Sequence, residues 1–166
     1  MATVDLATGI NDGKHPSRHG ATNVPYVVEA DLNLATALAS KGSALAAADV
    51  LQVIDVPAET MIMNAGIEVK TVTDGSTLTV DLGTGADADN FVDGFDCDSG
   101  TAAGTYAQNA AAFQPIIIGS TADTIDVTLA TLSGGAVTTG VLRVFAVLVD
   151  VNETSAPGIA AFNASV

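Results

Sequence analysis

Closely spaced carboxylates are the residues of this sequence that could most readily do chemistry. The stretch 81–98 holds six Asp and no base. Oxygen ligands at short spacing suit Ca²⁺, and the candidate ligands are Asp87, Asp89 and Asp93. The EF-hand pattern fails, because Phe91 stands at its third ligand position and no Glu follows at the twelfth. We therefore predict a solvated loop, fixed by Phe91 and Phe95, with a calcium loop of another type as the alternative.

Residues for nucleophilic catalysis do not come together. A catalytic Ser, Thr or Cys needs a nearby base, and the only histidines, His15 and His19, lie in the first 20 residues. Cys97 stands between two Asp, which disfavour its thiolate, so we expect a passive loop or core residue. Asp55 and Glu59 flank Pro57, an ordinary place for solvated acids. The sequence favours a protein that is not an enzyme and uses no cofactor or metal.

Composition predicts one acidic domain with an aliphatic core. The chain has 166 residues, 48% of them apolar, a single Cys and a formal net charge of -14. This charge would repel nucleic-acid phosphates and anionic lipids over most of the surface. No stretch approaches the roughly 20 apolar residues of a membrane span. We expect neither a nucleic acid nor a membrane as partner.

Both ends of the chain differ from the middle. Residues 1–25 are rich in Asn, Gly, Pro, Ser and His, and form a basic, irregular arm on an acidic body. Either a partner-contacting arm or a frayed terminus fits this pattern. The division expected is an arm at 1–25, a β domain at 26–152 and a tail at 153–166.

The middle of the chain reads as strands. A period of two dominates from Val50 onward, and an Ala-rich segment at 34–49, interrupted by Gly42, predicts one short helix. Strands separated by Gly-rich turns predict an all-β fold, an antiparallel β-sandwich or jelly roll. The expected strands are 26–34, 50–56, 61–63 with 66–73, 76–83, 91–95, 113–118, 124–132 and 137–151.

Asp74-Gly75 lies between two alternating segments and favours a two-residue hairpin turn. Such a turn would set Val69 opposite Val80 and leave the like-charged pair Glu68 and Asp81 on the other face. The apolar residues would then share one face.

Gly134-Gly135 likewise lies between two alternating segments and favours a two-residue turn. A tight turn there would set Val127 opposite Leu142, and Asp126 opposite Arg143. The sequence therefore predicts two antiparallel hairpins.

The final strand is apolar on both faces. Its second face includes Phe145, Val147 and Val149. Either the Ala-rich segment or a neighbouring subunit could cover this face, and we favour a subunit contact because exposed apolar patches mark interaction surfaces.

Four segments together resemble the head decoration, or cement, proteins of tailed bacteriophages. These are VIDVPAE at 53–59, AGIEVKT at 65–71, the stretch from DLGTGAD to VDG at 81–94, and ADTIDVTL with VLRVFAVLVDV between 122 and 151. The resemblance implies a non-enzymatic jelly-roll or β-sandwich protein that forms a homo-oligomer, often a trimer. It would bind the major capsid protein on the outer surface of the virion, after synthesis in the cytoplasm of the host bacterium.

Capsid contacts are expected from the basic arm and the residues that follow it. The hypothesised contact residues are Lys14, His15, Arg18, His19, Asn23 and Tyr26. Two other functions remain open: a calcium-dependent binding or adhesion module built on the Asp-rich loop, and a secreted surface-layer or fibre subunit. No export signal is visible at the N-terminus.

Overall fold

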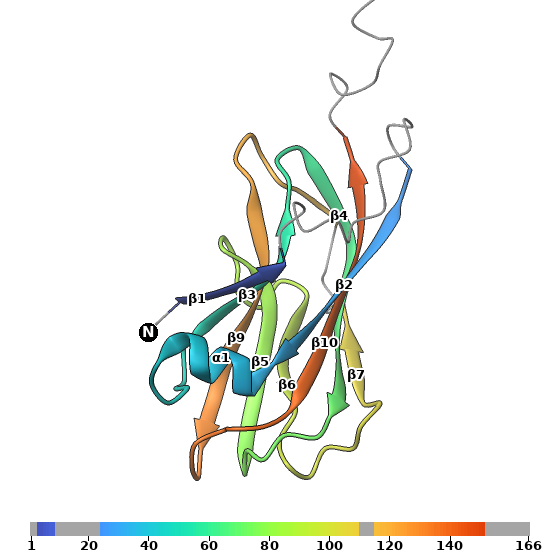
Figure 1. Cartoon of the computed structure of the whole chain (residues 1–166). Helices are drawn as coiled ribbons and strands as arrows, with labels where there is room; N and C mark the ends of the chain where they lie inside the picture. Colours follow the sequence, from blue (N-terminus) through green and yellow to red (C-terminus); the bar gives the residue numbers. More distant parts are fainter. Residues whose placement is uncertain (1–2, 9–23, 110–114, 152–166) are drawn as a thin grey trace, which may run out of the picture.

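Two β-sheets pack face to face in the computed structural model of the chain, which describes residues 3–8, 24–109 and 115–151 (Figure 1). Sheet A contains, in spatial order, β1 (Thr3–Thr8), β3 (Val50–Val56), β9 (Asp123–Ser133), β5 (Thr77–Thr84) and β6 (Val92–Asp96). Sheet B contains β2 (Tyr26–Asn33), β10 (Val141–Asp150), β4 (Thr60–Thr71) and β7 (Tyr106–Gln108), and the short β8 (Ile116–Ile117) also pairs with β4. One helix, α1 (Leu34–Lys41), follows β2.

The strand order is that of a jelly roll. Strands β2 to β5 alternate between the sheets, so that β2-β10-β4-β7 faces β3-β9-β5-β6. All the pairings among these eight strands are antiparallel. The predicted all-β sandwich is confirmed.

The core is aliphatic and lies between the sheets. The longer strands β2, β3, β4, β5, β9 and β10 contribute largely alternate side chains to it, as the period of two requires. The largest fully buried side chains are Phe91, Leu32, Leu34, Leu51, Ile62, Ile67, Leu78, Leu82, Ile125, Leu129, Leu142 and Leu148.

The two predicted hairpins are wrong. β4 and β5 belong to different sheets, as do β9 and β10, so each Gly-containing link crosses from one sheet to the other. The strands exchange partners: Val69 pairs with Leu142 instead of Val80. Arg143 correspondingly lies opposite Glu68 and Asp31, not Asp126. The same side chains point toward the core in the predicted hairpins and in the observed strand pairing. The period-two pattern of the sequence therefore could not distinguish between them.

The two crossing links contact each other. The Asp74 carboxylate accepts hydrogen bonds from the backbone N–H groups of Thr138 (2.8 Å) and Thr139 (3.0 Å), and from the Thr138 hydroxyl. A Cβ at Gly140, where φ is +123°, would stand 2.9 Å from the Cα of Thr73. Glycine is needed here for close approach between links rather than for a hairpin turn.

Helix α1 is shorter than the predicted segment 34–49. The Asn33 side chain caps its N-terminus, and Gly42 ends it in the left-handed region at φ 72°. Lys41, the last residue of the helix, forms an ion pair with the buried Asp49, which also accepts a hydrogen bond from the N–H of Ala46 at 2.8 Å. These contacts hold the return of the chain to β3.

Most of the expected strands form within a few residues of their predicted bounds. β3 matches the expected range 50–56. Two strands were not expected: β7, and β1, which pairs in parallel with β3. The segment 1–25 is therefore not irregular throughout, since residues 3–8 extend sheet A. Of the expected strand 113–118, residues 113–114 lie outside the described part, and β8 covers Ile116–Ile117.

Candidate interaction surface

The outer face of sheet B collects the side chains that point away from the core on β2, β10, β4 and β7. Arg143 is the Cα partner of Asp31 on β2 and of Glu68 on β4. Phe145 lies one step along the same face, between Glu29 and Gly66. We call this set of outward side chains the B face.

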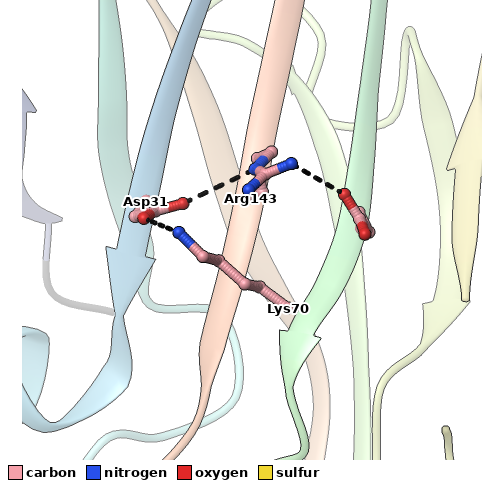
Figure 2. A network of polar contacts seen from close by, with 4 residues as sticks. Asp31, Lys70 and Arg143 are labelled. Atoms are coloured by element: carbon pink, nitrogen blue, oxygen red, sulfur yellow. Dashed lines mark hydrogen bonds and ion pairs between the residues drawn. The ribbon is translucent and has the colours of Figure 1, made fainter. Parts of the chain in front are cut away.

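Four charges of alternating sign cross the B face (Figure 2). Asp31 contacts both Lys70 and Arg143, with 3.8 Å between its Oδ1 and the Arg143 Nε. Nη1 of Arg143 lies 3.5 Å from Oε2 of Glu68. These side chains are 29% to 45% exposed, so each pair contributes only about 0–1 kcal/mol. Their main effect is to leave this part of an acidic protein close to neutral.

Phe145 packs over its own sheet. A Cβ added to Gly66 would lie 2.4 Å from Cζ of Phe145 and 2.8 Å from the carbonyl oxygen of Ala107. The ring therefore occupies the space that the glycine leaves open, as aromatic residues do opposite glycine in sheets. Half-burial of Phe145 follows from this contact within the chain.

Valines extend the apolar part of the B face beyond Phe145. Val27 on β2 pairs with Val147 on β10, and its side chain is 63% exposed. Val147 is half-buried. Val149 is only 7% exposed, so it offers a partner little area. Val27 is thus the most accessible valine in this row.

Exposed large apolar side chains are confined to sheet B and its flanks among the residues whose side chains the structure describes. Their list is Val24, Val27, Met63, Val72, Tyr106 and Ile117. The first and fourth flank β2 and β4, and the others belong to sheet B. This concentration makes sheet B the candidate interaction surface.

The outer face of sheet A is polar and acidic by contrast. Its strands expose Thr77 on β5 and Asp96 on β6, and Asp126 on β9, which is only 4% exposed, also points to this side. None of the described bases lies on sheet A, because Lys41 is in α1 and the other two are on the B face. The two faces of the sandwich therefore differ in both polarity and charge.

The Asp-rich loop folds back over β5. A Cβ at Gly83 would lie 2.0 Å from the carbonyl oxygen of Asp87, so only glycine allows this approach. Backbone hydrogen bonds link Thr84 and Asp87 in both directions, at 2.8 and 3.2 Å. Phe91 is fully buried and Phe95 is 8% exposed, which confirms that both fix the loop.

Carboxylates in and beside the loop interact with each other. The pKa of Asp87 is raised, mainly by a side-chain hydrogen bond with Asp89. Burial raises the pKa of Asp81, and the charges of Asp93 and Asp89 add to the effect. Within residues 3–8, 24–109 and 115–151, no three His, Cys, Asp or Glu side chains are grouped as metal ligands. The three candidate calcium ligands are thus not gathered into a site.

Cys97 is a core residue. Its side chain is fully buried, and its thiol lies 3.6 Å from the carbonyl oxygen of Leu78. Burial, with the charges of Asp96 and Asp98, raises the pKa of the thiol to about 12. The thiolate that nucleophilic chemistry needs is therefore suppressed.

Most of the hypothesised capsid-contact residues lie outside the described part of the chain. They are Lys14, His15, Arg18, His19 and Asn23. Tyr26 begins β2 and is half-buried, with its ring packed against the core. No helix in the described ranges has the length and apolar character to cross a bilayer.

Sequence reasoning found part of the B face and missed the rest. It singled out Phe145 and Val147, but not Val27 or the ion pairs among Asp31, Lys70, Arg143 and Glu68. Val27 becomes adjacent to Val147 only once β2 is known to pair with β10. The alternation of Val27, Glu29 and Asp31 along β2 was the available signal for an outward row.

Known proteins share this fold without close sequence similarity. A chain in the capsid of Ralstonia phage GP4 aligns with a TM-score of 0.65 and 14% identity, over 92% of this chain and 100% of that one. A chain in the Cyanophage Pam1 capsid asymmetric unit aligns with a TM-score of 0.59 and 14% identity, over 81% and 91%. Neither a protein-family model nor a curated protein sequence matches the chain. At these identities the likeness establishes the fold, a jelly roll that also occurs in two phage capsids.

Proposed function

We propose that this chain is a non-enzymatic structural protein of a phage virion, and that it binds the outer surface of the capsid as a decoration, or cement, protein. The observation that carries the proposal is the fold: a match at TM-score 0.65, over 92% of this chain, to a chain in a phage capsid. The Pam1 capsid chain supports the same assignment.

Features of the chain itself agree with a structural role. The thiol of Cys97 is buried, and burial raises its pKa to about 12, which suppresses the thiolate. An exposed apolar sheet face provides contact area, which is what an assembly protein needs. The site supports binding rather than catalysis.

The expected partners are the major capsid protein and further copies of this chain, with a trimer as the expected assembly. Lys14, His15, Arg18 and His19 form the only basic segment of the sequence, and we assign to them, with Asn23 and Tyr26, the contact with the capsid. Synthesis in the cytoplasm of the host bacterium would precede attachment.

Heads of the phage that encodes this chain provide the direct test. Heads from a mutant lacking the gene should bind purified chain at a saturating, stoichiometric number of copies, located outside the shell by cryo-electron microscopy. Bound chain should also raise the temperature at which the heads release DNA. Absence of the chain from purified virions, or a position inside the shell, would overturn the proposal.

The arm is best tested by substitution rather than deletion. β1 pairs with β3, so removal of residues 1–25 would also strip an edge strand from sheet A. Replacing Lys14, His15, Arg18 and His19 by Ser should weaken binding to heads. A charge-preserving control, Lys14→Arg with Arg18→Lys, should bind normally. Equal binding by both variants would remove the arm from the capsid contact.

A further inference from the structure

The B face is the part of the described surface that combines exposed apolar side chains with nearly balanced charge, since Lys70 and Arg143 stand against Asp31, Glu68 and Glu29. Val27 and Val147 lie side by side at one end, and the Asp31, Lys70, Arg143 and Glu68 network lies at the other. Phe145 lies between the two parts, in the next outward position on β10 after Arg143. The apolar and charged parts therefore form one continuous face.

Charge determines which partner this face suits. Two copies that each carry a net charge of -14 repel each other over most of their surfaces. On the outer face of sheet A, Asp96 is exposed and Asp81 is half-buried. No described base lies there, so contact between two copies would place acid against acid. Of the three bases in the described ranges, Lys41 is paired with Asp49 beside α1, and Lys70 and Arg143 both lie on the B face.

Burial of the Asp31, Lys70, Arg143 and Glu68 network need not strip any of these four groups of its partner. Glu29, exposed beside Phe145, lies outside this network. Asp31 already contacts both Lys70 and Arg143 within one chain. Burial of a charge is expensive chiefly when its partner is missing. When charged groups are already paired within one chain, a second copy can cover them at a lower desolvation penalty.

We propose that a second copy of this chain covers the B face, with Val27, Phe145 and Val147 at the centre of the contact. A basic partner would instead find complementary charge on sheet A. An acidic partner would be repelled by the body of the chain. The proposal deepens the oligomeric part of the proposed function, yet it concerns the isolated chain and does not depend on attachment to a capsid.

The test is the native mass of the purified full chain, measured by light scattering across a concentration series. The native mass should be at least twice the 16.5 kDa of one chain. Val27→Asp should reduce it to that of one chain at the same concentrations, because the new carboxylate would be buried without a partner. Val27 is 63% exposed in the single chain, so the fold should survive, as circular dichroism would verify.

Thr77→Asp is the matched control, because it adds the same charge to an exposed position of sheet A. It should leave the native mass unchanged. A wild-type chain that stays monomeric, or a folded Val27→Asp variant with wild-type mass, would overturn the proposal. Equal dissociation by both variants would also overturn it, because the added charge would then act irrespective of face. Capsid binding is measured separately, so failure of one proposal does not imply failure of the other.

Discussion

Asp74 joins the two crossing links through one carboxylate. It accepts three hydrogen bonds from Thr138 and Thr139, and these bonds, led by the Thr138 hydroxyl, lower the pKa of Asp74 from 3.8 to about 2. Charge-assisted bonds to backbone donors are among the stronger hydrogen bonds. Solvent exposure of this carboxylate reduces their net contribution. One side chain thus connects both sheets at the same end of the sandwich.

Asp74→Ala should lower the free energy of unfolding by about 1 kcal/mol at neutral pH. Because the folded state holds the lowered pKa, this stabilisation is complete above the unfolded pKa near 4 and is lost as the pH falls toward 2. Urea denaturation at several pH values would measure it. Asp93→Ala, at an exposed position, should change stability by less than about 0.5 kcal/mol. A wild-type advantage that persists undiminished at pH 2 would contradict the assigned role.

Gly66 provides a second test at the scale of single residues. Gly66→Ala would force the Phe145 ring or the β7 backbone to move, since the new Cβ would meet both within 3 Å. We expect a loss of about 1–3 kcal/mol, measured by thermal or urea unfolding. Gly119→Ala is the control, because a Cβ there meets nothing within 4 Å. Equal stability of the two variants would show that Phe145 does not depend on the glycine.

Individual strands could be predicted from the sequence, but their partners could not. Period-two alternation located most strands within a few residues, since it reports only which side of a strand is buried. Asp74-Gly75 suggested a type I′ turn, which needs positive φ at both residues. Neither residue has positive φ in the structure. The contacts between the two links join Asp74 to Thr138, 64 residues further along the chain, so local sequence patterns could not predict them.

The sequence likewise predicted only part of the candidate interaction surface. Phe145 and Val147 followed from a strand that is apolar on both faces. Val27 and Tyr106 required knowledge of which strands flank β10 and β4. β1 escaped notice because its six residues lie in a polar segment and pair with a strand more than 40 residues away.

Engineered cysteines would distinguish the two strand arrangements directly. In a Cys97→Ala background, Glu68→Cys with Arg143→Cys should form a disulfide, because the two residues are Cα partners on β4 and β10. Glu68→Cys with Asp81→Cys, the pair that a β4-β5 hairpin would bring together, should stay reduced under the same oxidant. Mass spectrometry after thiol labelling would read both outcomes. The reverse result would restore the hairpin.

Calcium tests the loop between β5 and β6. Asp87, Asp89 and Asp93 are not grouped as ligands, so millimolar Ca²⁺ should leave the melting temperature unchanged. A specifically bound ion would raise it, because binding to the folded state alone stabilises by RT ln(1 + [L]/Kd). Mg²⁺ at equal ionic strength is the control for screening. A rise with Ca²⁺ but not with Mg²⁺ would favour the calcium-dependent module.

At the scale of the whole molecule, the distribution of charge controls how copies meet. The net charge is -14, while the B face is close to neutral. Repulsion between copies is therefore long-range, and the attraction expected from the proposed B-face contact is a short-range effect of apolar burial. Added salt screens the electrostatic repulsion and leaves the apolar attraction unchanged.

Self-association should consequently strengthen as salt is added. Raising NaCl from about 20 mM to about 500 mM shortens the Debye length from roughly 20 Å to below 5 Å, so the protein concentration at half-association should fall. Sedimentation equilibrium across this range would measure the change, with Val27→Asp as the variant whose mass should stay that of a monomer throughout. Dissociation on adding salt would instead mean that ion pairs between copies hold the assembly. In that case the Asp31, Lys70, Arg143 and Glu68 network would pair across the contact rather than within each chain.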